Sequence, residues 1–440
     1  AVRALQSVWE RGSRPLLPHG SALGAGVRSK VADALSGVAL GGGGGGRGVA
    51  TPGGESAGRV AGEANVAYFI QVSESTLTLV PRLLRVLHHP LNVYVLHFDR
   101  KIPTWQVDHA VSELRANGAY TNVHLLESEL VTYRGISMVL NTLNAIDLLT
   151  SLRGAHPWDY MINLSGADYP LVSPTNQRRL LGADAVRGVG RNFLQMAPRT
   201  FWAEAKQWRY DRLFIDTSLG FGSSNSTLID SGAAQPLASQ LQYEFVAAES
   251  WMILTADFCG YLLHAPAARR MLMAFGFAAE PEEHYFATLL WNTPTYNETA
   301  VRHSLRHVIW VHNGRHGGQH PYTVDARGGG GAGAGAGAGA EWPFWRRIRR
   351  SPAFFIRKMA VANSGLMDLI DAEKSGVAAA PDAVAVEHSL AAARAAFACV
   401  VGLRPEQEAD ACITDPDDGA PAASAAERVA TAARFQRRRW

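Results

Sequence analysis

A polar turn follows a short apolar run at residues 160–164 and offers the first candidate for chemistry. Ser165, Gly166 and Asp168 form this turn, and Pro170 is expected to stop the strand from continuing. Ligands gather where the central strands of an open α/β sheet end, so Asp168 is a candidate substrate contact. An aspartate in a turn also commonly caps its own backbone, and the turn alone leaves both interpretations open.

Other charged residues are spaced so that they could act together. Asp99 follows a second apolar run, Glu282 and Glu283 form an acid pair, and Arg357 and Lys358 form a late basic pair. A carboxylate can accept a proton from a hydroxyl group, and fixed cations can hold a diphosphate. This set suits a nucleotide-diphosphate sugar donor.

Residues 200–221 mix aromatic and basic side chains, among them Trp202 and Arg209. Aromatic faces and guanidinium groups suit sugar rings and anionic groups. Trp202, Arg209 and Asp168 are therefore candidate acceptor contacts. The segment equally fits an ordinary loop that packs its tryptophans.

Several enzyme classes lack their characteristic motifs. The chain has no Gly-x-Gly-x-x-Gly turn after its first strand and no Walker loop, which argues against a dehydrogenase, a P-loop enzyme or another α/β nucleotide enzyme with a phosphate-binding glycine loop. A Gly-x-Ser-x-Gly match at Gly54–Gly58 lies in the low-complexity leader and not at a turn between a strand and a helix, and there is no His-Glu-x-x-His motif, so serine and zinc hydrolysis are not supported. The formal net charge of +3 is too small to indicate a nucleic acid partner.

The cysteines and the late acidic residues do not predict a metal site. Cys259, Cys399 and Cys412 give neither a disulfide framework nor a metal-ligand spacing. Asp415-Pro-Asp417 matches the Asp-x-Asp metal signature of many nucleotide-sugar transferases, but it lies in a low-complexity tail and not after a strand.

The elements that would position these residues alternate along the chain. Alternating strands and helices predict an α/β fold with a doubly wound, mostly parallel sheet and helices on both faces. Apolar runs predict strands at 66–72, 93–98, 123–126, 160–164, 250–254 and 308–311, and helical spacing predicts helices at 79–87, 105–117, 136–146, 258–264 and 281–290.

Composition divides the chain into three parts. Residues 1–62 are predicted to be a low-complexity leader, 63–374 the folded domain, and 375–440 a peripheral Ala-rich tail. The Gly/Ala insert at 328–340 is expected to be a flexible surface loop. No unbroken apolar run reaches about 18 residues, so no membrane span is predicted. The chain starts at Ala1 and not at a methionine, so an N-terminal anchor or signal could precede it.

Five stretches in the same order resemble the core-2/I-branching glycosyltransferase family, which includes the peptide-O-xylosyltransferases. The resemblance is greatest to its plant branch, the β-glucuronosyltransferases that act on arabinogalactan. It covers about 66–371, and the stretches are 87–99, 130–135, 158–171, 250–255 together with 281–288, and 355–358.

The resemblance implies a GT-A-type fold and an inverting transfer from a UDP-sugar. The family's catalytic base falls on Glu283, because residues 285–288 align behind it without a gap. The donor contacts that the resemblance implies are Val72, Asp99, Thr132, Tyr133, Arg134, Ser250, Trp251, His320, Arg357 and Lys358.

The resemblance also implies the substrates. Glucuronate is the first choice of sugar, moved to a hydroxyl of a glycan such as β-galactan or arabinogalactan. The alternatives are β-N-acetylglucosaminyl or xylosyl transfer to a glycoprotein, and a catalytically silent sugar-binding relative. Ser250 stands where xylosyltransferases have aspartate, which disfavours a xylosyl donor, and the presence of Glu283 argues against a silent relative.

No metal or other cofactor is expected, since family members without an Asp-x-Asp motif are thought to use protein cations instead. The expected partners are a UDP-sugar donor and a glycan or glycoprotein acceptor. The resemblance implies a location in the Golgi lumen, with membrane attachment only through an anchor that this chain does not contain.

Overall fold

The structure is a computed structural model. It describes residues 60–196, 206–235, 243–309, 345–362, 364–378 and 381–402, together with residues 241, 321, 323, 324 and 412. Nearly all of the predicted leader and the whole insert at 328–340 therefore lie outside the described residues.

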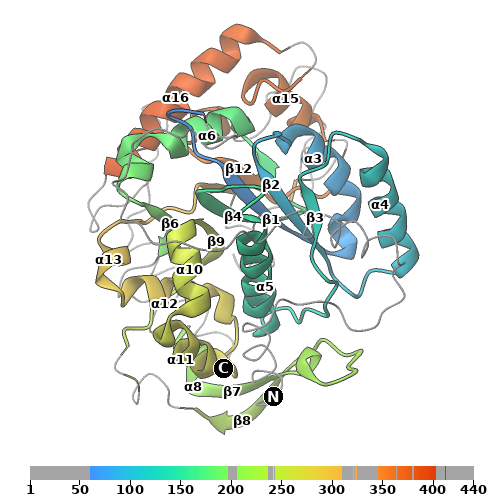
Figure 1. Cartoon of the computed structure of the whole chain (residues 1–440), viewed down its shortest axis with the longest axis vertical. Coiled ribbons are helices and arrows are strands. Elements are labelled where there is room, and N and C mark those ends of the chain that lie inside the picture. Colours follow the sequence, from blue (N-terminus) through green and yellow to red (C-terminus); the bar gives the residue numbers. More distant parts are fainter. Residues whose placement is uncertain are drawn as a thin grey trace, which may run out of the picture. The chain divides into compact units, whose positions relative to one another are not determined.

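A seven-stranded sheet forms the centre of the described domain (Figure 1). Its strand order is β10-β6-β9-β4-β1-β2-β3, and every neighbouring pair is parallel except the two pairs that β9 makes with β4 and β6. The mostly parallel sheet predicted from the sequence is thus confirmed. The strands are β1 (Val66–Val72), β2 (Val93–Phe98), β3 (Val123–Leu125), β4 (Tyr160–Ser165), β6 (Asn192–Met196), β9 (Ala248–Thr255) and β10 (Ala300–Val301).

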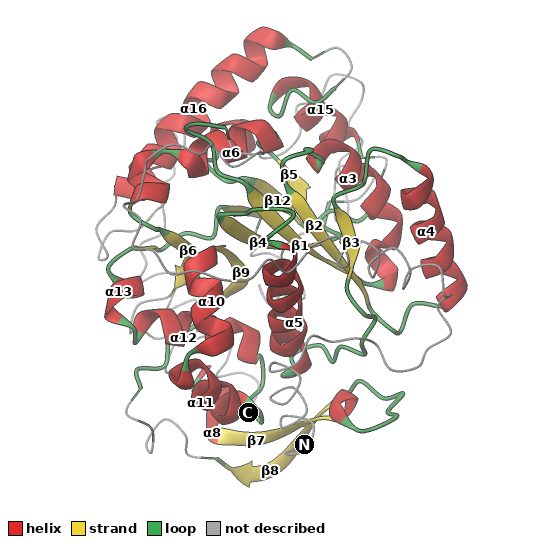
Figure 2. Ribbon diagram, viewed as in Figure 1, coloured by secondary structure: helices red, strands yellow, loops and turns green. Residues whose placement is uncertain are grey.

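Helices cover both faces of this sheet (Figure 2). On one face lie α3 (Val80–Leu87), α6 (Pro174–Gly182) and α16 (Ala383–Gly402), and on the other lie α5 (Ser137–Leu152), α10 (Ala256–His264) and α12 (Tyr285–Trp291). The central strands are buried on both faces, and for this reason their sequences are continuous apolar runs. The remaining described helices are α4 (Thr104–Ala116), α8 (Trp208–Asp211), α11 (Pro266–Phe275), α13 (Pro294–Asn297), α14 (Trp345–Arg350) and α15 (Gly365–Glu373).

Two smaller sheets complete the fold. The first has the order β11-β12-β5, with β11 (Arg306–Val308), β12 (Phe355–Arg357) and β5 (Tyr169–Pro170). Pro170 ends the run that begins with β4, as predicted, but it lies in an edge strand, where a missing N–H group is tolerated. The second is a hairpin of β7 (Arg212–Asp216) and β8 (Leu228–Ala234).

The chain beyond residue 375 differs from the peripheral tail that composition predicts. Phe397 of α16 stacks on Phe193 and Phe354, with ring centroids 6.0 and 5.7 Å apart, so this helix contributes to the main core. Cys399 and Cys412 form a disulfide, which corrects the prediction that the cysteines make none. Cysteine spacing alone could not reveal this bond, because the fold decides which thiols meet.

Helix α16 also bears on the membrane prediction. By length and composition alone it could cross a bilayer, with a mean hydropathy of 1.5, although 39% of its apolar window is buried in the domain. Glu387 and Arg394 interrupt its apolar run, which is why the sequence showed no span. A core helix passes the same test, so the finding is weak evidence for a membrane segment.

Candidate active site

The carboxyl ends of β1, β2 and β4 meet at one edge of the main sheet. The N–H group of Asp99 donates to the carbonyl of Val72 at 2.9 Å, and that of Gly166 donates to Gln71 at 2.9 Å. The strand order changes direction between β1 and β4, and such a switch point is where ligands bind in open α/β sheets. The structure therefore brings Val72, Asp99 and the turn of Asp168 to a common edge.

Asp168 takes both roles that the sequence left open. Its Oδ2 accepts a 2.6 Å hydrogen bond from the N–H group of Ser165, so it caps its own turn. Its Oδ1 lies 3.5 Å from Nη1 of Arg357, because β5 pairs with β12 just beyond the turn. The carboxylate is fully buried and is held at the switch point by both contacts.

Arg357 is the centre of a group that we call the guanidinium cluster: Arg306, Arg357, Asp168, Glu249 and Trp251. The Arg357 guanidinium lies over the Trp251 ring, with Cζ 3.8 Å from its centroid. Nε and Nη1 of Arg357 and Nε of Arg306 are buried and have no hydrogen-bond partner in the described structure. Buried donors without partners are costly, which points to an anionic ligand at this position.

Burial shapes the charges of this cluster. It lowers the pKa of Arg306 to about 10 and also lowers the pKa of Lys358, with the neighbouring Arg357 as a second cause. Burial raises the pKa of Glu249, whose carboxylate accepts a 3.0 Å hydrogen bond from Ser304. The sequence did not indicate Arg306 or Glu249, because neither belongs to a recognisable motif.

A second group, which we call the carboxylate cluster, consists of Glu280, Glu282 and Glu283 with Arg134, Lys206 and Arg209. Oε2 of Glu283 accepts hydrogen bonds from Lys206 at 2.7 Å and from Arg209 at 2.6 Å. Arg134 and Arg209 also pair with Glu280. The three cations thus pair with two of the three glutamates, Glu280 and Glu283, within one small region.

Adjacent glutamates in this cluster have opposite ionisation. Burial is the largest influence on Glu283 and acts to raise its pKa, but Lys206 and Arg209 together outweigh it and lower the pKa to about 2. Burial raises the pKa of Glu282 to about 8, with the charge of Glu283 as the second cause, and its Oε2 has no partner. At neutral pH, Glu283 is ionised and Glu282 is protonated.

A local break in the chain separates the acid pair from the helix that the sequence predicts over 281–290. Pro281–Glu283 form a 3-10 turn, η4, and α12 begins only at Tyr285. His284 has φ −132° and ψ −47°, which interrupts the helix between the two parts. The two acidic side chains therefore project from a tight turn and not from the first turn of a long helix.

Strained backbone marks the same region. Arg134, Glu280 and Leu305 are the non-glycine residues with positive φ in the described chain, at 68°, 50° and 53°. Two of them are tied together, since the N–H group of Glu280 donates to the carbonyl of Arg134 at 2.8 Å. The third precedes Arg306. Such strain persists where surrounding structure enforces it, commonly at functional sites.

Strand β9 connects the two clusters. Ser250 is fixed through its carbonyl, which accepts a 2.7 Å bond from Asn163 of the neighbouring β4. The charges of Arg357, Arg306 and Glu283 all act on the carboxyl group of Glu249 in this strand. The guanidinium and carboxylate clusters consequently act on the same residue of β9 and belong to one candidate site.

The remaining predicted residues can be placed only in part. Thr132 is buried, and Tyr133 is 64% exposed. Trp202 and His320 lie outside the described residues. Among the residues that the structure describes, no group of three or more His, Cys, Asp or Glu side chains could hold a metal ion.

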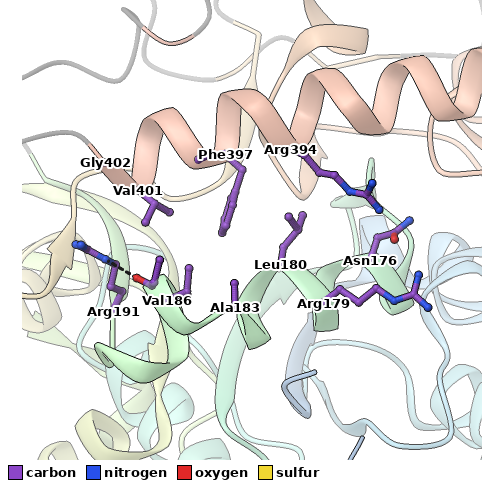
Figure 3. Close-up of a pocket in the computed structure, with 12 residues that line it drawn as sticks. Asn176, Arg179, Leu180, Ala183, Val186, Arg191, Arg394, Phe397, Val401 and Gly402 are labelled. Atoms are coloured by element: carbon purple, nitrogen blue, oxygen red, sulfur yellow. Dashed lines mark hydrogen bonds between the residues drawn. The ribbon is translucent and has the colours of Figure 1, made fainter. Parts of the chain in front are cut away.

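A groove of about 460 Å³ lies outside these two clusters (Figure 3). Helix α16 forms one wall, and the segment that contains α6 and the short helix η2 (Asp184–Gly188) forms the other. Its lining includes Leu180, Phe397 and Val401, with Arg191 and Arg394 at its margins. None of the predicted site residues lines this groove.

The chain is similar in sequence to several known glycosyltransferases. The β-glucuronosyltransferase GlcAT14B of Arabidopsis thaliana is 30% identical over 59% of this chain and 58% of its own length. Xylosyltransferase 2 of Canis lupus familiaris is 26% identical over 70% of this chain and 33% of its own. The chain thus spans less than two thirds of the length of these relatives.

One solved structure, a mannose-1-phosphate geranyltransferase from Thermus thermophilus, matches 50% of this chain and 67% of that one with 12% identity. Its TM-score of 0.22 is too low to support any argument. The Core-2/I-Branching enzyme family model matches residues 66–329, which contain the switch point, the acid pair and the strand between the two clusters. The chain therefore belongs to the Core-2/I-Branching enzyme family.

Proposed function

We propose that this chain is an inverting glycosyltransferase that moves glucuronate from UDP-glucuronate to a hydroxyl of a glycan such as β-galactan. The observation that carries the proposal is that an ionised glutamate and a set of guanidinium donors without hydrogen-bond partners lie close enough together to act on one residue of β9, Glu249. The choice of sugar and acceptor is supported by the named activity of the Arabidopsis relatives. A location in the Golgi lumen is part of the same proposal.

The guanidinium cluster suits the leaving diphosphate. Negative charge grows on the UDP group as the bond to the sugar breaks, and preorganised cations stabilise that charge most in the transition state. Arg357 and Arg306 present unpaired buried N–H groups, and Lys358 adds a third cation beside them. These protein cations can supply the charge without a metal, so we propose metal-independent transfer.

The carboxylate cluster suits the acceptor. Both hydrogen bonds to Glu283 end on Oε2, which leaves Oε1 without a donor from the described residues. An acceptor hydroxyl at Oε1 would lose its proton to Glu283 during attack on the anomeric carbon. Inversion follows from a single displacement, with the base and the diphosphate site on opposite sides of the reacting carbon.

A second candidate is a catalytically silent sugar-binding relative. The observation that favours it is the low pKa of Glu283, about 2, because a carboxylate held by two cations accepts a proton reluctantly. This candidate predicts donor binding without turnover.

Transfer assays with a panel of donors test both candidates. UDP-glucuronate, UDP-N-acetylglucosamine, UDP-xylose and UDP-galactose are each incubated with β-galacto-oligosaccharides, and UDP release and product mass are measured. We expect the highest kcat/KM with UDP-glucuronate. Preference for another donor would reject glucuronate, and binding of every donor without product would support the silent relative.

The acid pair supplies matched variants for the mechanism. Glu283→Gln keeps size and hydrogen bonding but cannot accept a proton, so kcat should fall about 10²–10⁴-fold while UDP-sugar affinity changes little. Glu282→Gln should be mild, because Glu282 is already neutral at pH 7. A fully active Glu283→Gln with an inactive Glu282→Gln would move the base by one residue, and two active variants would place it elsewhere.

A further inference from the structure

An exposed aromatic ring stands on a rigid turn beside the carboxylate cluster. The side chain of Tyr133 is 64% exposed, although both ends of its turn are fixed. The N–H group of Thr132 donates to Oγ of Ser137 at 2.8 Å, and the N–H group of Gly135 closes the turn on the carbonyl of Thr132 at 3.0 Å. The ring is therefore presented to solvent by a backbone that has little freedom.

Close packing on the far side of the turn reinforces this geometry. A Cβ atom at Gly135 would lie 2.2 Å from Oδ2 of Asp216, so any larger residue there would displace the Asp216 carboxylate. The same Oδ2 accepts a 2.9 Å hydrogen bond from the N–H group of Ser137. The β7 strand that carries Asp216 thus fixes the position of Tyr133.

The turn is also tied to the segment that carries Glu283. Arg134 pairs with Glu280 through its side chain, and its carbonyl accepts the Glu280 N–H group. Partial burial raises the pKa of Tyr133, and the negative charges of Glu280, Glu282 and Glu283 raise it further. The tyrosine consequently lies within electrostatic reach of all three carboxylates.

This combination has a chemical counterpart in a pyranose. One face of a galactopyranose ring presents C–H groups, which pack on the electron-rich face of an aromatic ring, while its hydroxyls can reach neighbouring carboxylates and cations. An exposed aromatic ring beside a catalytic base can hold the sugar whose hydroxyl the base activates. The site beside Tyr133 offers each of these groups.

We propose that Tyr133 is the stacking platform for a pyranose ring of the acceptor glycan and that it holds the reactive hydroxyl at Glu283. The inference rests on the proposed transfer function and identifies the acceptor subsite. It differs from the donor role that the family resemblance implies for Tyr133. The reason is that the turn is joined to the carboxylate cluster through the Arg134–Glu280 ion pair, whereas Arg357 and Arg306, which we propose hold the diphosphate, belong to the guanidinium cluster.

Steady-state kinetics with β-galacto-oligosaccharides test the platform. Tyr133→Ala should raise the acceptor KM about tenfold, the upper range for an aromatic stacking contact, and should change the donor KM much less. Tyr133→Phe should restore the acceptor KM, because the ring and not the hydroxyl makes the contact. The matched control is Trp105→Ala, which removes a 70% exposed ring from α4 outside the candidate site and should leave both KM values unchanged.

Three kinetic outcomes would overturn the proposal. An unchanged acceptor KM in Tyr133→Ala removes the platform. A rise confined to the donor KM assigns the ring to the donor subsite. A Tyr133→Phe variant as impaired as Tyr133→Ala shows that the hydroxyl, not the ring, is required.

Direct binding separates this inference from the proposed function. Saturation-transfer NMR with β-galactobiose should show contact with the parent protein and with Trp105→Ala, and weaker contact with Tyr133→Ala. Binding of this kind without any transfer would keep the platform and reject the proposed function. Transfer that proceeds normally in Tyr133→Ala, with unchanged galactobiose contact, would keep the function and reject the platform.

Discussion

The two clusters of the candidate site differ in how their charges are balanced. In the carboxylate cluster, each cation pairs with a glutamate, and Arg209 bridges Glu280 and Glu283. In the guanidinium cluster, the carboxylate of Asp168 is 3.5 Å from Arg357, and donor atoms of Arg357 and Arg306 remain unpaired. Nε of Arg134 and Arg209 also has no hydrogen-bond partner among the described residues, but each cation of the carboxylate cluster is held by a close glutamate, whereas the contact of Arg357 with Asp168 is long.

That difference indicates which cluster meets which part of the reaction. A set of unpaired buried cations gains most from an anion that arrives with the substrate, as a nucleotide diphosphate does. Cations that close carboxylates already hold gain less from another anion, and those carboxylates can instead orient a neutral hydroxyl. The division supports a donor site around Arg357 and an acceptor site around Glu283.

The largest loss of activity should come from Arg357→Met, which removes the positive charge but keeps an apolar side chain against Trp251. We expect kcat/KM to fall about 10²–10³-fold and UDP to bind more weakly, since the growing charge on the diphosphate loses its nearest cation. Kinetics and calorimetry with UDP measure both. Arg394→Met removes an exposed cation from the separate groove and is the control. Equal behaviour of the two variants would mean that Arg357 does not contact the donor.

A smaller effect is expected from Lys206→Met, which removes one of the two cations on Glu283. The pKa of Glu283 should then rise from about 2 towards its ordinary value. The base acts only when ionised, so activity is lost as the pH falls through this pKa, and the variant should lose activity at a higher pH. A rise of one unit in the pKa of Glu283 corresponds to about a tenfold lower kcat/KM at a given pH on the acidic limb of the profile. An unchanged acidic limb of the kcat/KM profile between pH 3 and 7 would show that Lys206 does not control the base.

Glu282→Gln should alter stability more than catalysis. The folded pKa of about 8 lies above the ordinary 4.5, so between these values the folded protein holds a proton that the unfolded chain has released. Stability of the parent therefore falls as the pH rises through this window, by roughly a few kcal/mol at most. Thermal unfolding at pH 5 and pH 9 should show a smaller loss in Glu282→Gln than in the parent. Equal losses would indicate that Glu282 is ionised at neutral pH.

The smallest effect should come from a chelator. If the guanidinium cluster supplies the positive charge, EDTA should leave the transfer rate near its starting value. Complete loss of activity that manganese restores would contradict this expectation. It would indicate that a carboxylate such as Asp99 or Asp168 holds a metal.

The sequence predicted the first half of the fold well for a physical reason. Residues 66–72, 93–98 and 160–164 are apolar runs because both faces of a parallel sheet are covered, and that pattern is local in the chain. The turn of Asp168 was also predicted from the sequence, because glycine and proline close to the end of an apolar run are typical of a turn. The sequence could not show that β9 runs antiparallel between β4 and β6, since strand direction depends on where the chain returns.

The candidate site was predictable only where its residues form motifs. The acid pair at Glu282 and Glu283 and the basic pair at Arg357 and Lys358 were recognised, whereas Lys206, Glu249 and Arg306 were not. These three gain their roles from partners that are distant in the chain: Lys206 lies 77 residues from the glutamate that it binds. A contact of that kind leaves no local pattern.

The sequence by itself determined many of the elements, among them β1, β2 and β4, together with the likeness to a family and the residue types that could do chemistry. Local backbone preferences and the period of apolar residues fix such features within short windows of chain. Only the tertiary structure decided which of two adjacent glutamates is ionised, because burial and the approach of Lys206 and Arg209 set those charges. The same packing decided that the donors of Arg357 stay unpaired, since the number of partners a buried group meets depends on the folded chain around it.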